Sequence, residues 1–397
     1  MKIFEYISFF IIVSIHTLED TNEFNLILND DLTTINGKTV GSKEINGVKF
    51  KDKILTITNK GVYILSGVLN GQIKINTNDN EQIILVLSGV TIINPSSNAI
   101  LISKAYEFDT SFFNFNTTKS LDVTKAGIIF VIRDGSENTI NGGKSSYADG
   151  AIHSAVSILI TGETKNNGIL NIYGTSEGIE TEKHFFMNGG ILNISSEEDG
   201  INANTPKNCI IMISGGKLLI NSGLGKEGDG IDSDGYILIN GGEIISAGKP
   251  DRNLGLHADN GIFIDGGKVF SVGSNLNTDL ISSSKPIMKL IFNDNVPASS
   301  NVTIKNINGK EIISYCADNA DFISETDRRT FISAVVSHPL FKINGIYHLY
   351  MDGIQLGYTG NNNDKEDQSE NSLFEEIKTD FILETTINNF SGVQKAF

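Results

Sequence analysis

Residues 187–194 read Met-Asn-Gly-Gly-Ile-Leu-Asn-Ile, and three later stretches repeat this pattern of a Gly-Gly pair followed by apolar residues, at 213–220, 239–246 and 264–271. The first glycines of the four pairs are separated by 26, 26 and 25 residues. A regular step of this size is the signature of a repeat architecture. The repeats therefore decide the fold before any single motif does.

A second motif alternates with the Gly-Gly pairs and joins an acidic residue to a glycine and an isoleucine, as in Asp199-Gly-Ile and Asp229-Gly-Ile. Each period contains two or three apolar runs that are too short for helices and are separated by glycine corners. Glycine pairs suit corners because glycine adopts positive φ without a steric cost. We predict an all-β chain whose repeats form a right-handed parallel β-helix, a solenoid in which each strand pairs with its equivalent one coil further on.

The repeat pattern also divides the chain. We expect the parallel β-helix to span residues 59–275, after an N-terminal cap at 18–58. The period stops near residue 279, and we expect a small C-terminal β module at 279–355. The remaining residues, 356–397, include a long polar stretch and are interpreted as a polar tail.

The first 17 residues have the pattern of a secretory signal peptide, with Lys2 followed by an apolar run from Ile3 to Ile15. We therefore expect a secreted protein, extracellular or at the cell surface. Four glycosylation sequons agree with export. They begin at Asn116, Asn193, Asn301 and Asn389.

Charge and cysteine content exclude several classes of protein. The chain has 31 Lys and Arg against 47 Asp and Glu, a formal net charge of −16. This balance argues against binding of nucleic acid or anionic lipid, which needs a basic surface. The apolar run of the leader is too short to span a bilayer, so we expect no membrane insertion of the mature chain. Cys209 and Cys316 allow one disulfide or two separate thiols.

The acidic corners line up as three columns if the coils stack. One column precedes each glycine and contains Asp149, Glu177, Asp199 and Asp229. The next contains His153, Glu180, Asn202, Asp232 and His257. Two residues further on stand Ala155, Glu182, Asn204, Asp234 and Asp259. Equivalent residues would lie about 4.8 Å apart, the strand spacing, where uncompensated carboxylates repel one another.

A divalent cation would relieve that repulsion. Calcium binds oxygen at about 2.3–2.6 Å, so two ligands on opposite sides of one ion are separated by roughly one strand spacing. We therefore predict Ca²⁺ between coils, with seven candidate ligands: Glu180, Glu182, Asp199, Asp229, Asp232, Asp234 and Asp259. The alternative is that Asp and Asn cap turns and stack as hydrogen-bonded ladders. His153 and His257 are four coils apart in one column, so we expect packed or solvent-facing histidines rather than a zinc pair.

The block from Gly228 to Ile244, Gly-Asp-Gly-Ile-Asp-Ser-Asp-Gly-Tyr-Ile-Leu-Ile-Asn-Gly-Gly-Glu-Ile, resembles the secreted carbohydrate-binding domain-containing proteins of polysaccharide-degrading bacteria. The resemblance covers most of residues 60–355. It implies that residues 59–275 are a carbohydrate-binding domain, a right-handed parallel β-helix that binds calcium and plant-type polysaccharides. Two features depart from the family pattern: Leu254 replaces the acidic residue of the last corner, and 108–124 is an unfamiliar polar insert.

Three classes of function remain open. We predict a non-catalytic extracellular protein that binds acidic or plant-type polysaccharides and depends on calcium. Parallel β-helices also include pectate lyases and polygalacturonases, so an enzyme of that kind is the first alternative. A lyase needs a base, usually Arg or Lys, beside its calcium, and the only arginines of the repeats are Arg133 and Arg252. The second alternative is a structural cell-surface or matrix adhesin, since the chain has no Trp and few repeat tyrosines for a sugar-binding platform.

Overall fold

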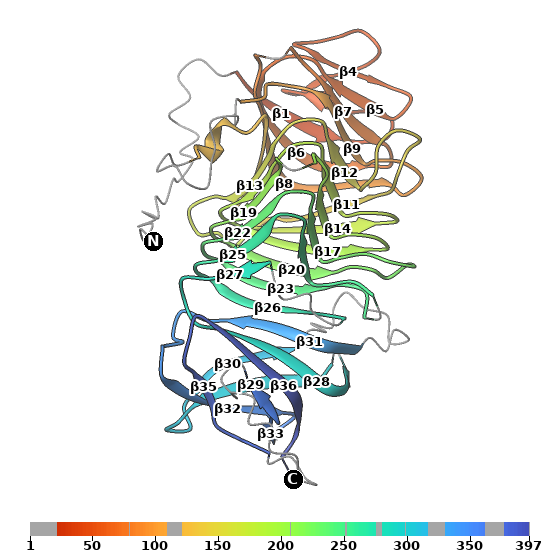
Figure 1. Ribbon diagram of the computed structural model, residues 1–397. Helices are drawn as coiled ribbons and strands as arrows, with labels where there is room; N and C mark the ends of the chain where they lie inside the picture. The colour runs from red at the N-terminus through yellow and green to blue at the C-terminus, as the bar shows by residue number, and fades with distance from the viewer. Residues whose placement is uncertain are drawn as a thin grey trace.

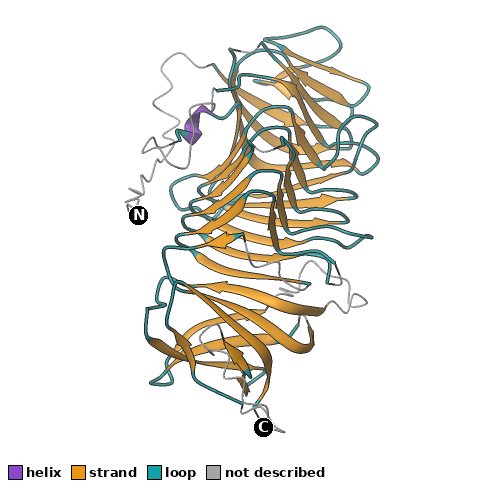
Figure 2. Ribbon diagram, viewed as in Figure 1, coloured by secondary structure: helices purple, strands orange, loops and turns teal. Residues whose placement is uncertain are grey.

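The computed structural model describes residues 22–78, 80–108, 121–206, 208–250, 252–274, 280–297, 299–316, 330–361 and 377–396. Within these residues the secondary structure is β, apart from one 3-10 turn, η2 (Val123–Lys125) (Figure 2). The predicted all-β class is confirmed. The expected signal peptide, residues 1–17, lies outside the described residues.

The repeats build three ladders of parallel strands, and successive strands of each ladder stack along the long axis of the molecule (Figure 1). The first ladder contains β10 (Ile128–Ile132), β13 (Ile158–Gly162), β16 (Phe185–Met187), β19 (Ile210–Ile213), β22 (Tyr236–Ile239), β25 (Gly261–Ile264) and β27 (Ile281–Ser282). The second ladder contains β11 (Glu137–Gly142), β14 (Ile169–Gly174), β17 (Ile191–Ser196), β20 (Lys217–Asn221), β23 (Glu243–Ala247) and β26 (Lys268–Gly273).

The third ladder belongs to a separate nine-stranded sheet. Its parallel strands are β9 (Ile100–Lys104), β12 (Ile152–Ser154), β15 (Ile179–Thr181), β18 (Ile201–Ala203), β21 (Ile231–Ser233) and β24 (Leu256–Ala258). Each period of the sequence thus contributes one strand to each ladder, in the same order every time.

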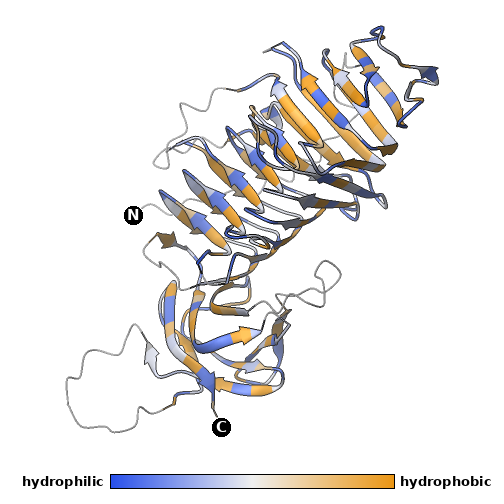
Figure 3. Cartoon of the chain, turned by 90° about the vertical axis from the view of Figure 1, so that its right-hand side faces the viewer, coloured by the Kyte–Doolittle hydropathy of each residue, from blue (hydrophilic) through white to orange (hydrophobic). Residues whose placement is uncertain are grey.

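The inward side chains of the three ladders form one core. Phe185, Ile194 and Ile201 come from the first, second and third ladder, and each is at most 1% exposed. Apolar and polar residues alternate along the strands, as Figure 3 shows, because successive side chains point to opposite faces. Burial of such an aliphatic or aromatic side chain contributes about 1.5–3 kcal/mol. The second glycine of the pair has positive φ in all four repeats, for example +78° at Gly190, as the corner was predicted to require.

The N-terminal strands extend these ladders. They are β1 (Glu23–Leu28), β2 (Thr34–Ile35), β3 (Lys38–Thr39), β4 (Val48–Lys51), β5 (Ile54–Ile57), β6 (Gly61–Leu69), β7 (Gln72–Asn76) and β8 (Ile83–Asn94). Strand β8 is long enough to pair with both β10 and β11. Strands β5 and β7 continue the third ladder in parallel, and β4 pairs with β5 in the antiparallel sense at the end of the sheet.

The outer face of the first ladder is apolar and is covered in part by residues near the start of the unfamiliar insert. Phe108 is 9% exposed, and its ring lies 6.2 Å from the rings of both His184 and Phe186. The His184 Nδ1 accepts a hydrogen bond from the backbone N–H of Ile210 at 3.1 Å. Burial, and then the nearby Lys183, lower the pKa of His184 to about 4, so the ring is neutral at pH 7.

The C-terminal strands form a second core against the outer face of the second ladder. They are β28 (Ile287–Pro297), β29 (Asn301–Asn306), β30 (Glu311–Cys316), β31 (Thr330–Ser337), β32 (Gly345–Met351), β33 (Ile354–Gly357), β34 (Gly360–Asn361), β35 (Phe381–Leu383) and β36 (Ile387–Lys395). Strand β31 pairs with β26 in the antiparallel sense and ends the parallel series. Phe270 of β26 stacks on Tyr315 with ring centroids 4.6 Å apart.

The interpretation of residues 356–397 as a polar tail is wrong for its last part. Strand β36 lies beside β28, and Phe390 is fully buried. The polar Asn388 is also buried, because its Nδ2 donates hydrogen bonds to the carbonyls of Ile287 and Thr385. A strand with hydrogen-bonded amides in its interior lacks the apolar content by which strands are found in a sequence.

Both cysteines are free thiols, so the disulfide alternative is not realised. Of the sequons, Asn116 lies outside the described residues, Asn301 is exposed, and Asn389 is partly buried on β36. Asn193 lies on β17, and its Nδ2, the atom that glycosylation would modify, donates a hydrogen bond to Asn171 Oδ1 at 2.9 Å. Among the described residues, the structure has no helix long and apolar enough to cross a membrane.

Candidate functional site

The third ladder presents a polar column on its outer face. The middle residues of its strands are in direct register: His153 opposes Glu180, Glu180 opposes Asn202, and Asn202 opposes Asp232, which in turn opposes His257. Their neighbours in each strand, such as Ile179 and Ile201, point inward and are fully buried. The alternation of the strand therefore turns these five side chains outward. This predicted column is confirmed.

Backbone hydrogen bonds set the register of the other two columns. Before the strands, the N–H of Gly178 donates to the carbonyl of Asp199 at 2.9 Å, and the N–H of Gly200 donates to that of Asp229 at 3.0 Å. After the strands, the N–H groups of Asp234 and Asp259 donate to the preceding coil. All seven predicted ligands therefore lie on one edge of the structure, in columns that run along the stack.

Side-chain contacts divide the seven into groups. The first group is centred on Glu180, which is buried and whose Oε2 lies 2.5 Å from His153 Nδ1. The same oxygen accepts a hydrogen bond from the backbone N–H of Asp149 at 2.8 Å. Asn204 Nδ2 donates to the other oxygen, Oε1, at 2.5 Å. Glu182 Oε1 approaches the far side of the His153 ring, 3.6 Å from Nε2.

Glu177 stands beside this group and carries an unmatched oxygen. Its side chain is buried, with 7% of the residue exposed, and Oε1 accepts a hydrogen bond from Asn202 Nδ2 at 2.9 Å. In the described part of the chain, neither Glu177 Oε2 nor Asn202 Oδ1 nor Asp149 Oδ1 has a hydrogen-bond partner, although all three atoms are buried. Burial, and then the charges of Glu180 and Asp199, raise the pKa of Glu177 well above its usual value. These three oxygens therefore have hydrogen-bonding capacity that the described residues do not fill.

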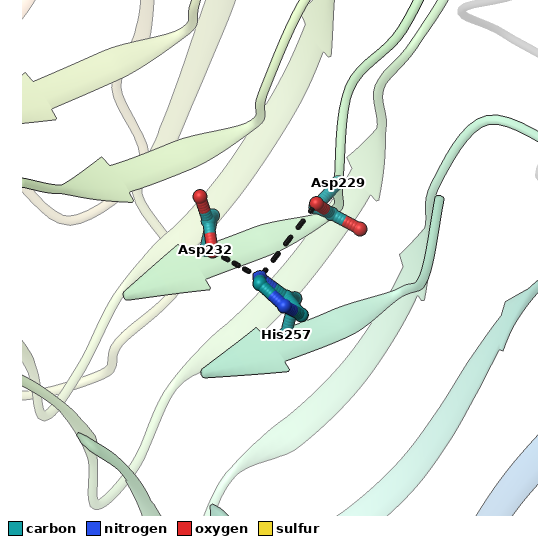
Figure 4. Close-up of side chains that lie close together, drawn as sticks. All are labelled: Asp229, Asp232 and His257. Carbon is teal, nitrogen blue, oxygen red and sulfur yellow. Dashed lines mark hydrogen bonds and ion pairs between the residues drawn. The ribbon is translucent and has the colours of Figure 1, made fainter. Parts of the chain in front are cut away.

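The second group is formed by Asp229, Asp232 and His257, whose ligand atoms all lie within 4.8 Å of one another. Figure 4 shows the imidazole between the two carboxylates. His257 Nδ1 is 2.7 Å from Asp232 Oδ1 and 3.9 Å from Asp229 Oδ2. The hydrogen bond to Asp232 raises the pKa of His257 to about 9, so the ring is protonated at pH 7.

Asp199 links the two groups. Its Oδ1 accepts a hydrogen bond from the backbone N–H of Asp229 at 2.6 Å. Burial, and then the charge of Asp232, raise the pKa of Asp199 to about 7. Asp234 and Asp259 lie beyond the strands and outside the cluster of Asp229, Asp232 and His257.

The site includes residues outside the set of seven predicted ligands. Glu177 and Asn202 belong to the predicted columns but not to the seven predicted ligands. His257, predicted to be packed or solvent-facing, is hydrogen-bonded to Asp232. The signal that could have selected Glu177 was its position in the column before the glycine, directly between Asp149 and Asp199. The sequence does not specify side-chain conformation. That conformation decides which of several stacked carboxylates remains without a hydrogen bond.

The donor atoms differ in the cation that they suit. Calcium takes oxygen ligands from carboxylates and amide carbonyls, and the unmatched atoms of Glu177, Asn202 and Asp149 are all oxygens of these kinds. The group around His257 offers an imidazole nitrogen, which suits transition metals, and its protonated ring already compensates the two aspartates. The residues that fit calcium therefore lie around Glu177, Glu180 and Asp199.

The chain is similar to a known protein family. A family model described as carbohydrate-binding domain-containing protein matches residues 51–321, which is more than half of the chain. One similar solved structure is that of the polysaccharide lyase-like protein from C. thermocellum, a gadolinium derivative, with 20% sequence identity and a TM-score of 0.47 over 66% of this chain and 95% of that one. A comparison with curated protein sequences finds no match.

Proposed function

Since this chain belongs to the family of carbohydrate-binding domain-containing proteins, we propose that it is a non-catalytic, secreted polysaccharide-binding protein that recognises acidic glycans through calcium. The observation that carries the proposal is the stacked set of polar columns on the third ladder, with its buried oxygens that lack a partner. We propose acidic glycans as the ligand because a cation held by protein carboxylates can also bind a sugar carboxylate.

We infer that the three ladders are the faces of a right-handed parallel β-helix. In support, every period contributes one strand to each ladder in the same order, and the inward residues of all three ladders belong to one core. Right-handed connections are the strong rule for parallel strands joined by crossovers. Such a coil keeps the columns straight, because each turn repeats the position of the one before it.

Within the site, Glu177, Glu180 and Asp199 would hold the calcium ion together with the amide oxygen of Asn202. When bound, the ion supplies positive charge that can bridge protein carboxylates to a carboxylate of the glycan. Glu180 is positioned by Asn204, by His153 and by the backbone of Asp149, so its side chain is held before any ion arrives. Preorganisation of this kind reduces the entropic cost of binding.

Three features support binding without catalysis. A lyase requires a neutral base beside the acidic cluster, and His257, the imidazole next to Asp232, is protonated at pH 7. Arg133 follows β10 and is paired with Glu163 at 3.4 Å, on a different ladder from the columns. Arg252 lies in the connection between β23 and β24, outside the strands of the third ladder that carry the middle column.

The test is retention of purified protein on polygalacturonate, measured with excess CaCl₂ and again after chelation by EDTA. We expect retention with calcium and its loss with EDTA. Glu177→Gln should weaken retention at least about tenfold, because it removes one ligand charge, a loss of about 1.4 kcal/mol or more. Glu311→Gln, an exposed carboxylate on β30, is the matched control and should behave as wild type.

Three results would contradict the proposal. Unchanged retention after chelation would exclude calcium bridging. Release of unsaturated or reducing-end products from polygalacturonate would identify an enzyme instead of a binding protein. If no polysaccharide on an array is retained in the presence of calcium, the structural adhesin becomes the better interpretation.

A further inference from the structure

Tyr147 is exposed to an extent that its packing does not explain. It lies in the connection between β11 and β12, and 94% of the residue is accessible to solvent. The next most exposed large hydrophobic residue among those described is Leu32, at 57%. A tyrosine ring that contacts almost nothing contributes nothing to folding, while it offers a large apolar surface at low conformational-entropy cost for binding.

The connection that carries Tyr147 is held in place by a buried side chain. Asn98 is fully buried, and its Nδ2 lies within hydrogen-bond distance of the carbonyls of Gly143, Ala148, Asp149 and Gly150, at 2.8–3.2 Å. The backbone N–H of Ser145 also donates to the carbonyl of Ala148, at 2.8 Å. Both ends of the connection are thus fixed to the core below, while its tip projects into solvent.

The tip also lies beside the acidic columns. Lys144 Nζ is 3.4 Å from Glu198 Oε1, although Glu198 is 54 residues away in the chain. The charges of Glu198 and then Asp149 raise the pKa of Lys144. Tyr147 itself precedes Asp149, the first residue of the column before the glycines, by two positions.

The lengths of neighbouring connections leave this edge uneven. The connections at 175–178 and 197–200, which contain Glu177 and Asp199, have four residues each. They are flanked along the stack by two connections of nine residues, 143–151 and 222–230. The longer connections stand one coil before and one coil after the short pair, and Tyr147 belongs to the first of them.

We infer that Tyr147 is the surface on which one sugar ring of an acidic polysaccharide stacks, and that Lys144 faces the carboxylate of that sugar. This inference rests on the proposed function and adds the residues that contact the glycan directly. The apolar face of a pyranose ring, formed by its C–H groups, matches the face of a phenol ring. The Lys144–Glu198 pair joins two half-exposed side chains, so it is weak enough to exchange for a carboxylate of the glycan.

The test measures binding of oligogalacturonate by calorimetry in the presence of calcium. We expect Tyr147→Ala to weaken binding about 2- to 12-fold, the range for loss of one aromatic contact. Tyr147→Phe should retain the affinity of the wild type. Leu32→Ala, which removes the next most exposed large hydrophobic side chain, should have no effect. Lys144→Ala should weaken binding of oligogalacturonate but not of a neutral oligosaccharide of the same length.

The outcomes separate this inference from the function on which it rests. If the wild type binds and Tyr147→Ala binds equally well, stacking on Tyr147 is refuted while calcium-dependent binding stands. If the wild type binds neither the acidic nor the neutral oligosaccharide, both proposals fall. Because the Tyr147 ring is almost fully exposed, Tyr147→Ala should unfold at the same temperature as wild type, and a large loss of stability would also contradict the model of an exposed, non-packing ring.

Discussion

Replacing Gly200 by alanine tests the stacking on which the site depends. Gly200 precedes β18 at an acidic corner, and its φ is not positive, so alanine is compatible with its backbone conformation. A Cβ at this position would lie 2.4 Å from Ile220 Cγ2 and 2.5 Å from the carbonyl oxygen of Gly230 in the next coil. That carbonyl accepts the hydrogen bond of the Ile201 N–H at 3.1 Å. Relief of the clash must therefore separate two adjacent corners.

The magnitude follows from these contacts. An added methyl group in a packed core costs about 1–3 kcal/mol. Weakening of the Ile201–Gly230 hydrogen bond adds about 1 kcal/mol. Reduced entropy of the unfolded chain offsets about 0.4–1 kcal/mol of this. We expect Gly200→Ala to lower the free energy of unfolding by about 1–3.5 kcal/mol.

The assay is equilibrium unfolding in urea, followed by circular dichroism, with EDTA present so that metal binding does not contribute. The control is Gly41→Ala, because a Cβ at Gly41 has no neighbour within 4 Å and its φ is not positive. This variant should be as stable as wild type or more stable by up to about 1 kcal/mol. If Gly200→Ala and Gly41→Ala agree within about 0.5 kcal/mol, the close vertical stacking of the corners is refuted.

Two further predictions concern regions outside the columns. His184 has a pKa of about 4 in the folded state against 6.5 when exposed. The unfolded state therefore binds the proton first as the pH decreases, and the free energy of unfolding falls. Between about pH 7.5 and pH 4.5, urea unfolding should show that the wild type loses about 2.5 kcal/mol more of this free energy than His184→Gln does. An equal loss in both proteins would show that His184 is not the responsible group. Phe270→Ala should lower the free energy of unfolding by about 3–5 kcal/mol, because this ring of β26 is fully buried against the C-terminal strands. Phe263→Ala, at a partly buried position, should lower it clearly less in the same assay.

The order of strands in the ladders and the register of the columns could be predicted from the sequence. Both follow from a period near 25 and from the position of the glycines, because a parallel stack places residues one period apart side by side. The pairing of Glu180 with Asn202, and of Asp232 with His257, confirms that logic at the level of single residues. The tail interpretation failed where this logic does not apply, since β36 pairs with β28 outside the repeats.

The sequence by itself determined which residues share a column, because periodicity fixes position along a repeated strand whatever the side chains do. Only the tertiary structure decided which of those residues are paired and which are not: the imidazole of His257 compensates Asp229 and Asp232, while Glu177 keeps a buried oxygen without a partner. It also decided that Tyr147 stands in solvent on a connection held by Asn98. These outcomes depend on side-chain direction, loop length and burial, which arise from contacts between coils and have no periodic signal in the chain.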